Sequence, residues 1–120
     1  MELRLTEGPV GVLEGPAHAP LMRRVDDVAE IVEQCLSSRV GALLLYEPNL
    51  TERFFDLSSG EAGEILAKLF QYRVRVAIVG PAGDTGLGER FRELLREEGR
   101  RGRFRLFDSA EPARAWVREL

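Results

Sequence analysis

The chain has 120 residues, of which 44% are hydrophobic, and this size predicts one domain whose core folds without covalent cross-links. A single cysteine, Cys35, and a single histidine, His18, exclude an internal disulfide and leave no second His or Cys ligand, so we predict no metal site and no cofactor. The net charge of −3 does not attract nucleic acid, and no membrane-spanning run or signal peptide is visible, which predicts a cytoplasmic protein without a membrane partner.

The first third of the chain predicts a hairpin, a connector and a helix. Short strands at 3–5 and 10–14 flank a glycine–proline turn, and the prolines of 15–20 are typical of a rigid connector. A helix is predicted over 25–36, because apolar residues recur there at helical spacing opposite acidic ones. Its predicted inward residues are Val25, Val28, Val32, Cys35 and Leu36.

The remaining chain alternates buried strands with amphipathic helices. Strands are predicted over 41–47, 73–80 and 103–107, the first two being nearly continuous apolar runs, as in strands buried on both faces. Helices are predicted over 60–72, from about Leu87 to Gly99, and after Ser109 as the N-cap. The order β-β-α-β-α-β-α-β-α predicts a single α/β domain with a largely parallel five-stranded sheet flanked by helices.

The segment 56–66, DLSSGEAGEIL, raises the main functional question. Ser58 and Glu61 have the spacing of a capping box at the start of the helix over 60–72, with Ser59 as the competing cap. Gly60 and Gly63 each cost about 1 kcal/mol relative to alanine inside a helix. Two such residues in one turn indicate a close approach to the backbone, either by another element of this domain or by an external partner.

The same helix start has the chemistry of an anion site. Free N–H groups and the helix dipole attract anions there, so the candidate phosphorylation or anion site is Ser58, Ser59 and Gly60. The candidate interaction surface around it consists of Phe54, Phe55, Asp56, Glu61 and Glu64. An exposed phenylalanine beside the serines would favour a protein-binding surface over a catalytic pocket.

The segment 80–88, GPAGDTGLG, follows a predicted buried strand and precedes a helix, as phosphate-binding loops do. It lacks the lysine of a Walker loop and the glycine spacing of a dinucleotide fingerprint. Gly83, Asp84 and Thr85 are therefore a candidate ligand loop only, and Asp84 or Thr85 is also the predicted N-cap of the next helix.

Four arginines alternate with inward residues on two strands that are expected to pair. If Arg73, Arg75, Arg103 and Arg105 point the same way, they form a patch for an acidic partner. The alternative is that carboxylates of the neighbouring helix pair with them.

The stretch 49–80 resembles the signature of the DUF4180 family of small bacterial proteins without an established activity. The shared parts include FFDL at 54–57, GEAGEIL at 60–66 and AIVG at 77–80, and a looser similarity extends over 103–117. Two positions depart from that signature, since Ser58–Ser59 replaces an Arg–Thr pair and Pro81 stands where Asp is usual.

A more distant resemblance is to the STAS domain of anti-sigma factor antagonists, carried by a strand, a loop with D-(x)-S-S-G and a helix. In that family a partner kinase phosphorylates a serine at the start of the second helix and thereby switches partner binding. Here Leu57 adds one residue between Asp56 and the serines. The resemblance implies a STAS-like fold and a phosphorylation switch at Ser58 or Ser59.

Together these features predict a STAS-like regulatory or protein-interaction domain without catalytic activity, switched by phosphorylation or anion binding at the start of the second helix. Its partner is another protein or a second copy of the chain. The alternative is a small-ligand or anion-binding module at the carboxyl edge of the sheet, formed by the loops 54–60 and 80–86. No nucleophile–base pair, metal set or cofactor motif is recognisable, so an enzyme is the least favoured class and no catalytic residue is identified.

Overall fold

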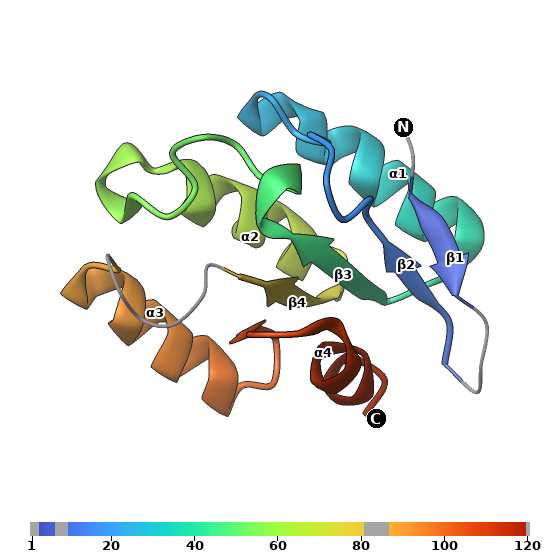
Figure 1. Ribbon diagram of the computed structural model, residues 1–120. Helices are drawn as coiled ribbons and strands as arrows, with labels where there is room; N and C mark the ends of the chain where they lie inside the picture. The colour runs from blue at the N-terminus through green and yellow to red at the C-terminus, as the bar shows by residue number, and fades with distance from the viewer. Residues whose placement is uncertain (1–2, 7–9, 81–86, 120) are drawn as a thin grey trace.

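The computed structural model describes residues 3–6, 10–80 and 87–119, and within them five strands form one sheet (Figure 1). The strands are β1 (Arg4–Thr6), β2 (Val12–Glu14), β3 (Ala42–Tyr46), β4 (Arg75–Val79) and β5 (Phe104–Phe107). They lie side by side in chain order, with β1 antiparallel to β2 and every later pair parallel. The predicted hairpin and the largely parallel sheet are confirmed.

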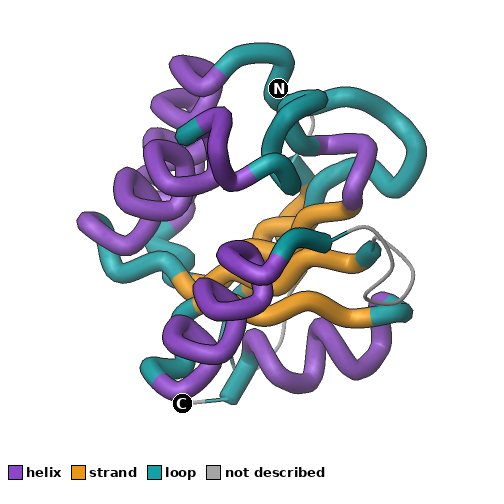
Figure 2. Tube along the Cα trace, turned by 90° about the vertical axis from the view of Figure 1, so that its left-hand side faces the viewer, coloured by secondary structure: helices purple, strands orange, loops and turns teal. Residues whose placement is uncertain are grey.

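The helices also follow the predicted order. They are α1 (Val28–Ser38), α2 (Glu61–Gln71), α3 (Glu89–Arg100) and α4 (Ala110–Val117), with short 3-10 turns η1 (Val25–Asp27), η2 (Glu47–Asn49) and η3 (Leu57–Ser59). Because consecutive strands are neighbours and crossovers are right-handed, α1, α2 and α3 share one face of the sheet. Figure 2 shows the strands enclosed between helices, and α4 covers the other face, where it packs on β3, β4 and β5.

Strand register determines which side chains face each layer. Phe104 is the register partner of Val76 and contacts the rings of Phe54 and Phe91 on the α1–α3 face. Arg75 precedes Val76, so it points to the opposite face, where its guanidinium lies 4.2 Å from the ring centroid of Trp116 in α4. The core therefore has two apolar layers, one on each side of the sheet.

Two features of the predicted helices are wrong in detail. Leu36 was expected to face inward, but 56% of it is exposed. The buried residues of α1 are Val28, Ile31, Val32 and Cys35, and Leu36 lies about 80° from Val28 around the helix axis, at the edge of that stripe. The N-cap of α3 is Gly88, because the helix begins at Glu89, so neither Asp84 nor Thr85 caps it.

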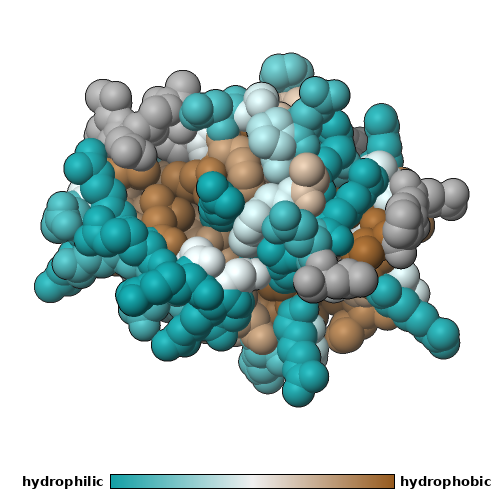
Figure 3. Space-filling view, turned by 90° about the horizontal axis from the view of Figure 1, so that it is seen from below, coloured by the Kyte–Doolittle hydropathy of each residue, from teal (hydrophilic) through white to brown (hydrophobic). Residues whose placement is uncertain are grey.

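Ser109 is the N-cap of α4 as expected, although its side chain makes no capping hydrogen bond. Cys35 is 2% exposed, as expected for a small core residue, and burial raises the pKa of its thiol to about 11. The view from below in Figure 3, on the side of α3 and α4, shows hydrophobic side chains in separate areas among hydrophilic ones. Among the described helices none has the length and apolar character needed to span a bilayer.

Candidate functional site

The segment before α2 is held together by its own polar groups. The carboxylate of Asp56 accepts hydrogen bonds from the backbone N–H of Ser58 at 3.2 Å and from its hydroxyl at 2.5 Å. The hydroxyl of Ser59 donates to the carbonyl oxygens of Asp56 and Arg53, and it accepts a hydrogen bond from the N–H of Glu61 at 3.2 Å. Both serine hydroxyls are therefore engaged within the loop.

The predicted capping box between Ser58 and Glu61 is wrong. Ser58 belongs to the 3-10 turn η3, which Asp56 caps, and Gly60 then takes a left-handed conformation with φ of 80° before α2 begins. This reversal separates Ser58 from the first turn of α2. The competing cap, Ser59, is the one that bonds to the N–H of Glu61.

The two glycines of this segment are not covered by the rest of the described chain. A Cβ atom placed on Gly60 or on Gly63 would have no other heavy atom within 4 Å. Gly60 is explained by its positive φ, whereas Gly63 lies inside α2 without a special conformation. The first interpretation of Gly63, a close approach by another element of the domain, is wrong for the residues that the structure describes.

The predicted interaction surface is divided by the fold. Phe54 is 0% exposed and sits among the rings of Phe55, Phe91 and Phe104, so its assignment to an exposed surface is wrong. It points inward, toward Phe91 of α3 and Phe104 of β5. Phe55 and Glu61 are half-buried, while Asp56 and Glu64 are exposed, so these four remain accessible.

A groove runs beside this surface between α2 and α3. It encloses about 450 Å³ and is lined on the α2 side by Gly63, Ala67 and Phe70 and on the α3 side by Leu94 and Glu98, among others. The carboxylate of Glu98 is paired through both oxygens with Arg103, at 2.7 and 3.0 Å. The groove therefore has apolar walls and an internally neutralised charge pair at one side.

The proposed ligand loop cannot be placed, because Gly83, Asp84 and Thr85 lie outside the described residues. A smaller cavity of about 260 Å³ lies between the segment before α2 and the start of α3. It is lined by Asp56 and Ser58 from the segment before α2, and by residues 88–91 at the start of α3, which include Arg90.

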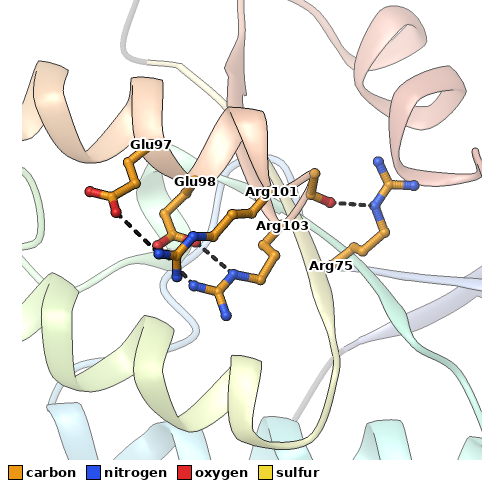
Figure 4. A network of polar contacts seen from close by, with 6 residues as sticks. Arg75, Glu97, Glu98, Arg101 and Arg103 are labelled. Atoms are coloured by element: carbon orange, nitrogen blue, oxygen red, sulfur yellow. Dashed lines mark hydrogen bonds and ion pairs between the residues drawn. The ribbon is translucent and has the colours of Figure 1, made fainter.

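The predicted arginine patch does not form. Figure 4 shows Arg103 turned toward Glu98 while Arg75 points to the other side. Arg103 also lies 4.4 Å from the ring centroid of Phe70 in α2, whereas Arg75 donates to the carbonyl oxygens of Gly102 and Glu119. Arg73 and Arg105 are exposed. The alternative, that helix carboxylates pair with these arginines, is confirmed for Arg103, which pairs with Glu98 of α3. Arg103 precedes β5, which begins at Phe104, so its side chain need not follow the alternation of that strand.

A charged cavity that the sequence interpretation did not find lies where β2 and β3 end. It encloses about 590 Å³ and is lined by Arg4, Glu14, Tyr46 and Arg114, together with Leu3 and residues 15–17. Glu14 is 7% exposed, and both its oxygens bind Arg114, at 2.6 and 2.9 Å. The two residues of this pair are 100 positions apart in the sequence. The local sequence signal for it is a carboxylate, Glu14, at the end of the otherwise apolar strand β2.

Burial alone would raise the pKa of Glu14, but hydrogen bonds from Arg114 and Thr6 and the charges of Arg114 and Arg118 outweigh it and lower that pKa. The same hydrogen bond to Glu14 raises the pKa of the Arg114 guanidinium. Glu14 is therefore ionised near neutral pH, and the ion pair is intact there.

We expect Glu14→Gln to reduce the free energy of unfolding by about 1–2 kcal/mol at pH 7, since a neutral amide replaces a charge-assisted acceptor. A carboxyl whose pKa is lowered by folding stabilises the protein above its unfolded pKa of about 4.3, and this contribution is lost as the pH falls through the folded value. Urea unfolding should therefore show a difference between wild type and Glu14→Gln that shrinks below pH 4. The exposed Glu33→Gln is the control, and a Glu14 difference that stays constant down to pH 2.5 would contradict the assigned ion pair.

Within the described residues no three His, Cys, Asp or Glu side chains gather as a metal site requires. No curated protein and no solved structure matches the chain, so its resemblance to STAS domains stays a prediction. The sequence profile of the domain of unknown function DUF4180 matches residues 7–117, nearly the whole chain. The chain therefore belongs to the DUF4180 family.

Proposed function

We propose that this domain is a regulatory protein-interaction module that presents the start of α2, and the groove between α2 and α3, to a basic segment of another protein. The regulatory part of the proposal comes from the resemblance to STAS domains. The interaction part depends on one observation, the open space above Gly63.

Gly63 destabilises α2 by about 1 kcal/mol relative to alanine, and its missing side chain serves no contact within the described chain. Its backbone, together with Ala67, instead opens onto the groove beside α3. A glycine at this position allows an external chain to approach the helix backbone closely, and half-buried Phe55 and Leu57 add apolar surface nearby.

The charge of this surface favours a basic partner over a second copy of the chain. Residues 52–64 carry four carboxylates, Glu52, Asp56, Glu61 and Glu64, against one guanidinium, Arg53. The most arginine-rich helix of the chain is α3, but its four arginines are balanced by four glutamates. It therefore lacks the excess positive charge that would complement residues 52–64.

Ser58 is the exposed hydroxyl through which this surface would be switched. A phosphate on Ser58 would carry up to two negative charges beside the Asp56 carboxylate, which now accepts two hydrogen bonds from Ser58. Repulsion between the two groups would open the turn over Leu57–Ser59. Modification would thus change both the shape and the charge of the docking surface.

Gly63→Gln is the variant that tests the docking surface. We expect it to raise the free energy of unfolding by about 0.5 kcal/mol, because glutamine is the better helix former and its Cβ meets no neighbour. It should nevertheless weaken partner binding at least about tenfold, since its side chain projects into the open space. Ala115→Gln, at an exposed position of α4 on the opposite face, is the matched control.

Photo-crosslinking residues at 64 and 67, compared with one at 115, identify the partner in cells of the native host. The proposal expects one protein to be captured from both positions of α2, and its purified form to bind wild type and Ala115→Gln but not Gly63→Gln. Crosslinking of the chain to itself would show that the docking surface binds a second copy of the chain, and would contradict a partner of another kind. Equal capture from position 115, or binding that Gly63→Gln leaves unchanged, would falsify the docking surface.

The second candidate function is the binding of a small anion beside the same segment. It is supported by the cavity of about 260 Å³, whose lining includes the guanidinium of Arg90 and the hydroxyl of Ser58 together with the carboxylates of Asp56 and Glu89. We expect Arg90→Gln to leave stability unchanged within about 0.5 kcal/mol, as an exposed substitution. Loss of phosphate-induced NMR shifts in this variant would support the candidate.

A further inference from the structure

The cavity at the ends of β2 and β3 lies where small ligands bind in α/β proteins. Glu14 and Tyr46 are the last residues of two adjacent parallel strands, and ligands commonly bind beyond the carboxyl ends of such strands. Since α4 packs on β3, β4 and β5, this part of the same face stays open toward β1. Its volume of about 590 Å³ is in the range of pockets for small organic molecules.

The wall of this cavity is held in place by Asn49, which is 0% exposed. Its amide nitrogen donates to the carbonyl oxygens of Pro16 and Ala19, at 2.6 and 2.9 Å, and its oxygen accepts from the N–H of Tyr46 at 2.7 Å. A side chain on Gly15 would collide with Asn49, since a Cβ there would lie 2.3 Å from the amide oxygen. Connector and strand end are thus fixed together, and the cavity is formed before any ligand arrives.

In this cavity both oxygens of the Glu14 carboxylate already accept hydrogen bonds, whereas guanidinium N–H groups of Arg114 and Arg4 have no acceptor among the described residues. Both oxygens of Glu14 are occupied, by Arg114 and by the hydroxyl of Thr6. Arg114 uses Nε and Nη2 for that pair, and its Nη1 has no acceptor among the described residues. Arg4 is the register partner of Glu14, lines the cavity and has no ion-pair partner in the described chain.

Positive charge prevails among the described residues of this cavity. Two guanidinium groups, of Arg4 and Arg114, line it against one carboxylate, Glu14. Arg118 acts on Glu14 and Glu111 acts on Arg114, so these two outer charges offset each other. The described residues therefore give the cavity one excess positive charge. Leu3, Pro16, Ala17 and the ring of Tyr46 provide apolar wall.

We propose that this cavity binds a small organic molecule that combines an apolar body with a carboxylate or phosphate group. The anion is bound by Arg4 and by the free Nη1 of Arg114, while the body lies against Ala17 and the Tyr46 ring. A cationic ligand is disfavoured because both oxygens of the buried carboxylate already accept hydrogen bonds from Arg114, and the guanidinium groups of Arg4 and Arg114 would repel it. This site is separate from the docking surface on α2.

The test is NMR titration of the folded chain with four probes of similar size: benzoate, phenyl phosphate, benzyl alcohol and benzylamine. Benzoate and phenyl phosphate should give saturable shifts of the amides of Gly15, Ala17 and Tyr46, weakening as salt is added. Whichever of the two binds more tightly identifies the anionic group of the natural ligand. The neutral and cationic probes should bind at least about tenfold more weakly.

Two variants test separately the charge and the volume of the cavity, and both leave the ion pair of Glu14 and Arg114 unchanged. Arg4→Gln removes one exposed guanidinium and should weaken benzoate binding about tenfold, as for a lost charge-assisted hydrogen bond. Ala17→Leu fills the cavity without changing its charge and should weaken all binding. Arg100→Gln, an equal charge change on α3, should have no effect.

The proposal is overturned if benzylamine binds as well as benzoate, if Arg4→Gln and Arg100→Gln behave alike, or if the shifts fall outside the cavity. Thermal unfolding of each variant shows that it is folded before titration. Because Gly63→Gln leaves this cavity intact, benzoate binding by that variant distinguishes a failure here from a failure of the docking surface.

Discussion

Asn49→Ala is expected to lower the free energy of unfolding by about 4 kcal/mol. The substitution removes all three hydrogen bonds of a side chain that is 0% exposed, and it leaves the N–H of Tyr46 and the carbonyls of Pro16 and Ala19 without partners. Each buried polar group that loses its partner costs about 1–3 kcal/mol. Urea unfolding followed by circular dichroism measures the loss, with the exposed Gln71→Ala as the amide control.

Two further variants determine whether this loss comes from the clamp between strand end and connector. Asn49→Asp keeps an oxygen that accepts from the N–H of Tyr46, but it replaces the donating nitrogen by a second oxygen that faces the carbonyls of Pro16 and Ala19. Its loss of unfolding free energy should therefore be smaller in acid, because a protonated carboxyl can donate to one of these carbonyls. Gly15→Ala should be destabilising alone, through its 2.3 Å clash, but much less so in the Asn49→Ala background. Additive effects would show that the two residues act independently.

Phe54→Ala is expected to cost about 3–5 kcal/mol, the range for removing a fully buried aromatic side chain. Its ring lies 5.2 Å from that of Phe55, 6.1 Å from Phe91 and 6.5 Å from Phe104, so the substitution leaves a cavity between the sheet, α3 and the segment before α2. Chemical unfolding and the near-ultraviolet dichroism of the aromatic cluster both report this loss.

Phe55→Ala is the matched comparison, because the two residues are adjacent and of the same type but Phe55 is half-buried. We expect its cost to be about 1–2 kcal/mol, and any effect on partner binding to belong to Phe55 alone. A Phe54→Ala variant no less stable than Phe55→Ala would mean that Phe54 is exposed in solution.

Much of the fold follows from local patterns. The apolar runs before Tyr46 and Val79 predicted buried parallel strands, and helical spacing predicted that Val28, Val32 and Cys35 of α1 face inward. The predicted capping box was wrong because two serines compete for the same role. Ser58 and Ser59 both fit the N-cap of α2 by sequence, but Asp56 accepts two hydrogen bonds from Ser58 and holds it in a separate 3-10 turn.

The site was less predictable because its contacts are distant in sequence. Nothing local indicates that Glu14 meets Arg114, or that Asn49 reaches Pro16 and Ala19. Similarly, two adjacent phenylalanines at a helix entry do not indicate which one is buried, because the decision rests on Phe91 and Phe104 from later elements. Long-range packing, rather than propensity, determined these positions.

The ion pair between β2 and α4 has a consequence for synthesis on the ribosome. The four parallel strands each pair with the strand made just before, so the sheet can assemble progressively as the chain emerges. Glu14, however, leaves the tunnel a hundred residues before Arg114, with which it pairs in the finished fold. Until then its carboxylate remains hydrated at an unfinished face, and a nascent chain stalled before α4 would have a sheet but no anion pocket.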